Sequence, residues 1–387
     1  MLAIRAPRLF DGRDLHHDRA VLVENGRVTA VVSGGPPEAA AVVDLGADVT
    51  LLPGLIDCHV HLAFDGSPDV LGGLERPGLA ERMRQAARLE LAAGVTTVRD
   101  LGDLGYLALE LGLGLDGPEI LAAGPPITTP RGHCWFLGGE AAGEREVRAA
   151  VRERAARGAH VVKVMVTGGE MTPGSRSHLL QYGPAELRAA AGEAHAHGLP
   201  ITGHAHCGAG IAAALDAGFD SIEHCSFFTE DFYELDHALI RRLAASGVVA
   251  SLTAGVAPGA PPPPPRIQAR LSAVLEGLSA CYAAGVRFVI GTDAGVGPPK
   301  PHGVLPYGAE MLTGIGYAPV DVLRAITSVA AETCHVDGRK GMIAPGHDAD
   351  LLAVAGDPPR RHHGAVPSRR RLPDGAVLWS ERAPAEP

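Results

Sequence analysis

The chain has 387 residues, of which 46% are hydrophobic and 20% are charged, and its formal net charge is −10. This is the composition of a globular protein, and the length suits one large domain with an accessory part. The acidic balance, without a basic cluster on any expected helix, argues against nucleic acid as the main partner. No apolar stretch reaches the roughly 18 residues of a membrane span.

Two further features bear on the compartment. The six cysteines are scattered and form no CxxC pair, which favours free thiols in a reducing cytoplasm over a disulfide framework. The N-terminal segment MLAIRAPRLFDG has no apolar core of the kind that a signal peptide carries. We therefore expect a cytoplasmic protein that does not span a membrane.

The two ends of the chain have similar patterns. Within AVLVENGRVTAVV, the pair Asn25-Gly26 lies between two β-branched runs and predicts a β-hairpin. Near the other end, Gly346–Asp350 leads into the strand-like run LLAVAG, and a later GAVLW again favours a strand. We expect residues 1–52 and 339–387 to form one small β unit together.

Between these ends, residues 53–338 alternate apolar strands with helix-period segments, which is typical of βα units around a parallel sheet. Several helical segments finish on a glycine, as C-terminal caps often do. The fold class is therefore α/β, and the strand number and length of this region fit a TIM (β/α)8 barrel. The eight expected strands cover residues 55–62, 95–101, 119–124, 160–166, 200–206, 220–225, 248–253 and 287–293.

A proline run lies in the loop at 258–265, between the seventh strand and its helix. It predicts a stiff polyproline II segment at the surface. Because this loop leaves the carboxyl end of a strand, a wall or lid over the active-site mouth is the alternative.

Polar residues interrupt strands that should be continuously apolar if they are buried in a parallel sheet. Each such residue, taken alone, could be a hydrogen-bonded core residue or a turn cap. All of them fall at or near the carboxyl ends of strands, where TIM barrels build their active sites, and their side chains suit zinc or a similar divalent ion. The candidate metal ligands are His59, His61, Lys163, His204, His224 and Asp293.

Lys163 is unusual because it is one of three lysines and lies between Val162 and Val164 in an apolar strand. An unpaired ammonium there is costly. One interpretation is an ion pair with a buried acid. The other is carbamylation by carbon dioxide, which would turn the cation into an anion able to bridge two metal ions.

Two histidines in loops on the same side are candidates for substrate contact. His133 follows the third strand and could also stabilise a developing oxyanion, which makes it a candidate catalytic residue. His302 follows the eighth strand.

The motifs together resemble those of the amidohydrolase superfamily. Pro53–His61 is similar to its PGLIDxHxH signature, Gly291–Gly295 resembles its eighth-strand motif, and Gly341–Asp350 resembles the return to its small β-sandwich. Val162–Val164 and Ser221–His224 resemble the subgroup of prolidase-type dipeptidases, arginine/lysine carboxypeptidases and imidazolonepropionase. The resemblance implies a homo-oligomer in which the terminal β unit is a β-sandwich and 53–338 is the catalytic barrel.

The resemblance also implies roles for the candidate ligands. His59 and His61 would bind one metal ion with Asp293, which would also be the proton shuttle. His204 and His224 would bind the second, and carbamylated Lys163 would bridge both. Two divalent ions, expected to be zinc, would activate a bridging hydroxide that attacks the substrate carbonyl.

The expected reaction is hydrolysis of an amide C–N bond in a small molecule, namely a dipeptide or an N-acyl amino acid. A cyclic amide, carbamate or ester could be cleaved by the same dinuclear site. Deamination usually goes with one metal ion and no bridging lysine, so Lys163 counts against it. A non-catalytic scaffold is an interpretation of another class, but this chain keeps all six ligand residues.

Overall fold

The computed structural model describes residues 1–358 except Pro36, Ala39, 112–115 and Pro264, and the backbone of two further strands at 367–371 and 377–381. In this part of the chain, no helix is both long enough and apolar enough to cross a membrane. All six cysteines are buried and free, which confirms the prediction of free thiols.

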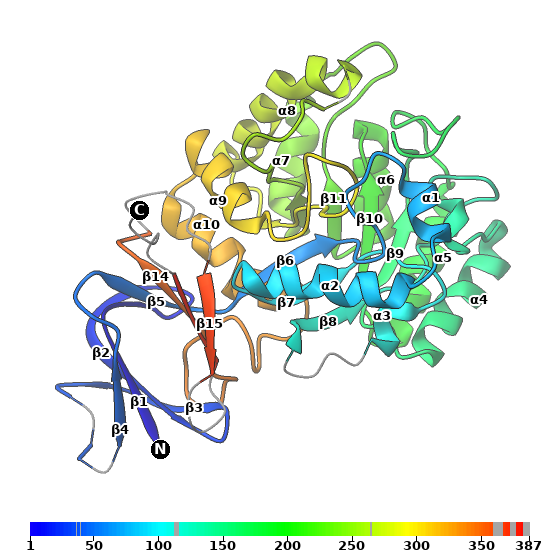
Figure 1. The fold of residues 1–387 in the computed structure, drawn as a ribbon. Coiled ribbons are helices and arrows are strands. Elements are labelled where there is room, and N and C mark those ends of the chain that lie inside the picture. Colours follow the sequence, from blue (N-terminus) through cyan, green and yellow to red (C-terminus); the bar gives the residue numbers. More distant parts are fainter. Residues whose placement is uncertain are drawn as a thin grey trace.

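Strands from both ends of the chain form one sheet in the order β15-β16-β14-β5-β1-β2-β3, with β4 paired to β1 (Figure 1). The expected turn at Asn25-Gly26 is confirmed, because both residues have positive φ (51° and 74°) and Glu24 pairs with Arg27 across the turn. The strands are β1 (Leu2–Phe10), β2 (Leu15–Glu24), β3 (Arg27–Ser33), β4 (Ala41–Asp44), β5 (Val49–Pro53), β14 (Asp350–Ala355), β15 (Pro367–Arg371) and β16 (Val377–Glu381).

The terminal sheet is tied directly to the first parallel strand. β5 and β6 are separated only by Gly54, whose backbone N–H donates to the carbonyl of Asp350 at 2.8 Å. β14 pairs antiparallel with β5, with Leu351 opposite Pro53. β6, the strand that carries the first candidate ligands, therefore follows directly after a sheet that contains strands from both ends of the chain.

Eight parallel strands make up the centre of the described structure, and all eight expected strands are confirmed, each one to four residues shorter than predicted. They form a five-stranded sheet, β13-β12-β11-β10-β9, and a three-stranded sheet, β6-β7-β8. The strands are β6 (Leu55–Val60), β7 (Val95–Asp100), β8 (Glu119–Ala122), β9 (Val162–Met165), β10 (Ile201–Ala205), β11 (Ser221–His224), β12 (Val249–Leu252) and β13 (Phe288–Ile290).

Backbone contacts join these two sheets at both of their edges. Val60 at the end of β6 forms a parallel bridge with Ala294, which follows β13. Ile127, which follows β8, forms a parallel bridge with Val164 of β9. The carboxyl ends of strands from the two sheets are thus held next to each other.

Helices lie on the outer side of the parallel strands (Figure 1). The expected glycine caps after α2, α4, α5 and α8 are confirmed, with φ between 69° and 84°. The helices are α1 (Val70–Glu75), α2 (Leu79–Ala92), α3 (Leu107–Glu110), α4 (Gly143–Ala156), α5 (Pro184–Ala196), α6 (Gly208–Ala217), α7 (His237–Ser246), α8 (Pro265–Ala283), α9 (Leu305–Gly314), α10 (Pro319–Ala325) and α11 (Ser328–Thr333), with a short 3-10 turn, η2 (Trp135–Leu137).

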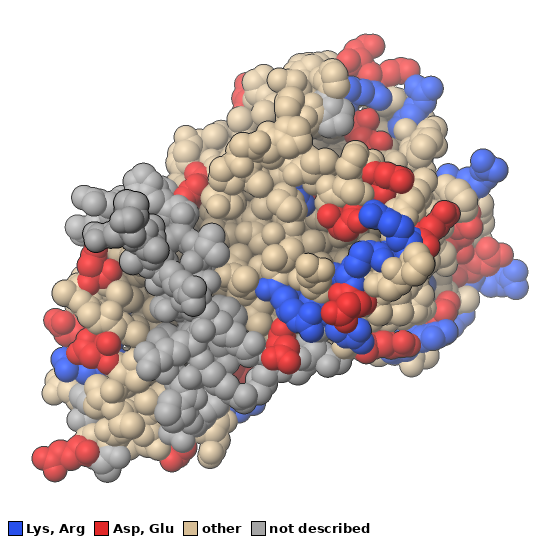
Figure 2. Space-filling view, in the orientation of Figure 1, with Lys and Arg blue, Asp and Glu red and all other residues tan. Residues whose placement is uncertain are grey.

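Two surface features bear on the sequence-based expectations. Pro261 and Pro262 are exposed and lie outside helices and strands, as expected for a surface loop, while Pro264 lies outside the described residues. On the face shown in Figure 2, acidic and basic side chains are interspersed, and the described part of that face has no extended basic patch.

Candidate metal centre

The structure brings the predicted ligands together. Five of the six lie at or just beyond the carboxyl ends of strands β6, β10, β11 and β13, and Lys163 is the second residue of β9, although the sequence positions span more than half of the chain. The side chains of His59 and Lys163 are almost fully buried, at 1% exposure each. Asp293 is the most open, with 16% of its side chain exposed.

Three of these residues form a first cluster, which we call the His59 cluster: His59, His61 and Asp293. The Nε2 atoms of the two histidines are 3.2 Å apart. Asp293 Oδ1 lies 3.4 Å from His59 Nε2 and 3.5 Å from His61 Nε2. Three donor atoms therefore face one point.

The other ring nitrogens of this cluster face hydrogen-bond acceptors. His61 Nδ1 lies 3.0 Å from the carbonyl oxygen of Gly102. His59 Nδ1 lies 2.9 Å from Glu223 Oε2, although the ring N–H direction is not aligned for a hydrogen bond. Acceptors on the outer nitrogens place the protons there and leave the two Nε2 lone pairs facing each other and Asp293. Such an arrangement is repulsive unless a cation lies between the donors, so the residues fit a metal ion.

A second cluster, the His204 cluster, contains His204, His206 and His224. His224 Nε2 lies 2.9 Å from His204 Nδ1. The other ring nitrogen of each histidine again contacts a hydrogen-bond partner. His204 Nε2 lies 3.1 Å from the Gly168 carbonyl oxygen, and His224 Nδ1 lies 3.2 Å from the Thr253 hydroxyl. This second convergence of ring nitrogens also fits a divalent ion.

The two clusters are adjacent. The rings of His59 and His224 are 5.4 Å apart between centroids. His224 and Asp293 both have positive φ, 73° and 60°, at the points where the chain leaves β11 and β13. Left-handed backbone is uncommon for residues other than glycine, and such strain gathers at functional sites.

The side-chain amine of Lys163 has no ion pair or hydrogen bond among the described residues, and the interpretation as an ion-paired lysine gains no support there. Burial lowers the pKa of Lys163 to about 8, and the charges of Glu223 and Asp293 only partly oppose that effect. A buried amine of this kind is neutral more readily than an exposed lysine.

Burial also governs the other ionisable groups of the centre. It lowers the pKa of His61 to about 3, with a further contribution from His59, so that the ring is neutral and able to bind metal. Burial raises the pKa of Asp293, but His59, His61 and Lys300 together lower it below its ordinary value. The centre thus offers neutral imidazoles and an ionised carboxylate.

The backbone near the centre requires a glycine at one position in particular. A Cβ at Gly291 would lie 2.3 Å from Cβ of His59. The chain before Asp293 can therefore approach β6 closely only without a side chain there.

The structure places His133 beside the centre. It is 4% exposed, its ring lies 4.7 Å from that of His204, and its Nδ1 has no hydrogen-bond partner among the described residues. Burial, followed by the charge of His206, lowers the pKa of His133 to about 3. The ring is therefore neutral, and its Nδ1 is buried without a partner in the described structure.

His302 lies in a different environment, outside both clusters. Its Nδ1 contacts Glu90 Oε1 at 3.0 Å and its Nε2 contacts the Phe64 carbonyl at 2.9 Å. Burial lowers the pKa of His302, but the Glu90 carboxylate raises it more, and it lies above its ordinary value. Both ring nitrogens are occupied by the protein itself, which argues for a structural role in place of the expected substrate contact.

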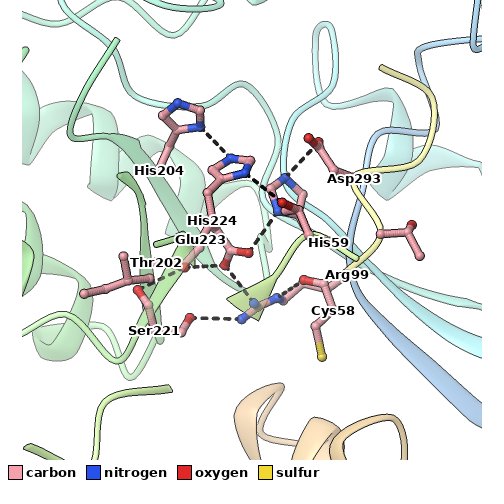
Figure 3. A network of polar contacts seen from close by, with 12 residues as sticks. Cys58, His59, Arg99, Thr202, His204, Ser221, Glu223, His224 and Asp293 are labelled. Atoms are coloured by element: carbon pink, nitrogen blue, oxygen red, sulfur yellow. Dashed lines mark hydrogen bonds and ion pairs between the residues drawn. The ribbon is translucent and has the colours of Figure 1, made fainter. Parts of the chain in front are cut away.

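Sequence reasoning did not select three side chains that the structure places at the centre: His206, Glu223 and Arg99. His206 belongs to the His204 cluster and stacks on His224 at 4.2 Å between ring centroids. Glu223 and Arg99 form a fully buried ion pair of 3.0 Å beneath His59 (Figure 3). The signal for both was a charged residue inside an apolar parallel strand, the same rule that selected Lys163.

Comparisons with known proteins agree with this geometry. A model of the amidohydrolase family matches residues 50–385, and the chain therefore belongs to that family. Ochratoxinase of Aspergillus niger is 29% identical over 342 residues, which cover 80% of this chain and 70% of that protein. Imidazolonepropionase of Cereibacter sphaeroides is 27% identical over 419 residues, covering 97% of this chain and 98% of that protein.

Among solved structures, a Xaa-Pro dipeptidase with bound methionine in its active site is similar, with a TM-score of 0.80 and 26% identity over 93% of this chain and 95% of that chain. The predicted family is thereby confirmed. The protein is an enzyme of the amidohydrolase class, a hydrolase of amide-type C–N bonds.

Proposed function

We propose that this enzyme cleaves the amide C–N bond of a dipeptide or an N-acyl amino acid with the help of two divalent metal ions, zinc in the first instance. The observation that carries the proposal is the pair of adjacent histidine clusters. In each cluster, ring nitrogens of different histidines face one another, while the other nitrogens of the same rings face hydrogen-bond acceptors. The Xaa-Pro dipeptidase likeness supports the choice of substrate class.

The ligand assignment follows the two clusters. His59, His61 and Asp293 would hold one ion, and His204 and His224 the other. Lys163 would join them as a carbamate, formed when its neutral amine adds to carbon dioxide and releases a proton. Its burial at 1% exposure and its lack of a partner in the described structure support this modification.

Bound divalent ions supply Lewis acidity, which polarises a carbonyl and makes water a nucleophile near neutral pH. Asp293 faces the same point as the two Nε2 atoms, at 3.4 and 3.5 Å, and has the open carboxylate that a proton shuttle needs. It takes the proton of the water that adds to the amide carbon and delivers it to the leaving amine as the C–N bond breaks. His133, with its free Nδ1, donates to the carbonyl oxygen as negative charge develops there.

The acid end of such a substrate has a candidate partner in Arg270 of α8. Its side chain is 3% exposed, yet its contacts to Glu170 Oε1 and to the Thr229 carbonyl are both long, at 3.4 Å. Arg270 lies over the ring of Phe228, which stacks in turn on His206 of the His204 cluster. A substrate carboxylate would complete the donor set of this under-bonded guanidinium.

The test is turnover. Enzyme loaded with zinc in the presence of bicarbonate is incubated with a library of dipeptides and N-acyl amino acids, and free amine is followed by mass spectrometry. Cleavage by the parent enzyme and none by Asp293→Asn supports the proposal. Silence toward this library from enzyme that holds two zinc ions refutes the substrate class and redirects the search to cyclic amides, carbamates and esters, whereas a folded chain that binds no metal would be a non-catalytic scaffold.

Two structural proposals accompany this function. The contacts at both edges of the two parallel sheets support a closed (β/α)8 barrel over residues 53–338. The shared terminal sheet supports a separate β-sandwich domain made of residues 1–52 and 339–387. We also propose a cytoplasmic homo-oligomer, which size-exclusion chromatography with light scattering would test.

A further inference from the structure

Glu223 is a charged residue in the middle of the protein. It lies in β11 next to His224, and its side chain is completely buried. Burying a carboxylate is costly unless its oxygens are paired, so its partners indicate what it does.

Each carboxylate oxygen of Glu223 has a different partner (Figure 3). Oε1 accepts a hydrogen bond from the Thr202 hydroxyl at 2.6 Å and another from Arg99 Nη2 at 3.0 Å. Oε2 faces His59 Nδ1 at 2.9 Å, and neither of these two atoms has a hydrogen-bond partner elsewhere among the described residues. One oxygen therefore anchors the carboxylate, and the other is left for the histidine.

Arg99 fixes the carboxylate relative to the strand that carries His59. Its Nε donates to the carbonyl oxygen of Cys58 at 2.7 Å, one residue before His59 in β6. Its Nη1 lies 3.4 Å from the Ser221 hydroxyl in β11. The guanidinium thus connects β6 with β11, and rotation of the Glu223 carboxylate away from His59 would break its bonds to Arg99 and Thr202.

We propose that Glu223 is a positioning residue that prepares His59 for metal binding. An ionised carboxylate has no proton to donate, so Oε2 at 2.9 Å from Nδ1 favours the neutral tautomer of His59 that carries its proton on Nδ1. The lone pair of Nε2 is then directed at His61 and Asp293. Glu223 also balances the positive charge of Arg99, which would otherwise repel a cation in the His59 cluster. This inference rests on the metal centre of the proposed function.

A purely structural ion pair between Arg99 and Glu223 is the competing explanation. A structural ion pair would explain the contacts of Oε1. It would not explain why Oε2 and His59 Nδ1, both fully buried, lie 2.9 Å apart. The two explanations differ in what happens to zinc affinity when the carboxylate becomes an amide of the same shape.

The experiment compares Glu223→Gln with Glu90→Gln. Both glutamates are fully buried, and each contacts a histidine Nδ1, at 2.9 Å for His59 and 3.0 Å for His302. The glutamine amide at 223 can donate to Nδ1 and so move the imidazole proton to Nε2. Zinc dissociation constants of the full-length apo-proteins are measured by competition with a chromophoric chelator in bicarbonate buffer.

We expect Glu223→Gln to weaken one of two zinc sites about 10- to 100-fold, the range seen when the outer partner of a metal-binding histidine is lost. Glu90→Gln should keep both affinities. Wild-type zinc affinity at both sites in Glu223→Gln overturns the proposal. An equal loss of zinc affinity in Glu90→Gln also overturns it, because the loss would then be a general effect of replacing a buried glutamate. A parent enzyme that binds no zinc would overturn the metal centre itself, which is a distinguishable result.

A second measurement does not depend on metal or on full retention of stability. In the apo-protein, 15N chemical shifts of His59 distinguish the Nδ1–H from the Nε2–H tautomer. We expect Nδ1–H in the parent and a shift toward Nε2–H in Glu223→Gln. If that variant does not fold, Thr202→Val removes the hydroxyl that contacts Glu223 Oε1 at 2.6 Å and the Ser221 carbonyl at 3.1 Å, keeps the carboxylate itself, and should weaken zinc binding several-fold. An Nε2–H tautomer in the parent, or unchanged zinc affinity in Thr202→Val, would contradict the positioning role.

Discussion

Replacing His302 by alanine should destabilise the protein without a specific effect on substrate binding. The change leaves two buried acceptors without their partner, the Glu90 carboxylate at 3.0 Å and the Phe64 carbonyl at 2.9 Å. Because Glu90 is completely buried, the loss should be that of a broken internal ion pair, about 3–5 kcal/mol in the free energy of unfolding. With an unfolding entropy of about 2.1 cal/mol/K per residue, the melting temperature should fall by about 4–6 °C.

The loss should depend on pH. The folded-state pKa of His302 lies above the ordinary value of 6.5, because the Glu90 carboxylate outweighs burial. Protonation of His302 therefore contributes stability that is fully present below pH 6.5 and is lost as the pH rises through the folded-state pKa. The difference in melting temperature between parent and His302→Ala should be larger at pH 6 than at pH 9.

The assay is thermal unfolding followed by circular dichroism, with His195→Ala as the control. His195 also pairs with a carboxylate, Asp220 at 3.0 Å, but 47% of its side chain is exposed, so its loss should cost less than about 1 kcal/mol. If His302→Ala melts like the control and instead raises KM, the reasoning fails and His302 contacts the substrate, as the sequence first indicated.

Three further outcomes are expected. Asp293→Asn should abolish turnover while circular dichroism shows folded protein; full activity would refute the proton shuttle. Lys163→Met should lower bound zinc below two ions per chain, as measured by elemental analysis. Because the substitution removes a buried unpaired amine, it should also raise the free energy of unfolding of the apo-protein by about 1–3 kcal/mol. A less stable apo-protein would contradict that reasoning. Gly169→Ala should reduce kcat/KM with little change in zinc content, because its Cβ would lie 2.3 Å from His133 Nε2; unchanged kinetics would separate His133 from the reaction.

Much of the fold could be predicted because its signals are local. The eight parallel strands are short apolar runs between helix-period segments, and the glycine after α2 or α4 marks where a helix ends. The ligand candidates were recognisable for a related reason, since polar side chains such as Lys163 or His204 contradict the apolar pattern of the strand that carries them.

The features that could not be predicted are contacts between residues far apart in the sequence. Nothing near His302 indicates that Glu90, on α2, lies against its ring. The partnership of Glu223 with Arg99 joins β11 to β7, which pair in different sheets. His206 follows the last residue of β10, and strand alternation does not show where a side chain points once the strand has ended.

The pairing of β14 with β5 has a consequence for biosynthesis. Thr50, a few residues ahead of the first ligand strand, has its antiparallel neighbour at Val354. In a nascent chain, β5 therefore cannot pair with β14, and β6 directly after it cannot take its final position, until almost the whole protein has been translated. Assembly of the metal centre is placed late in synthesis, and a prematurely terminated chain would lack the strand that holds its first two histidines in place.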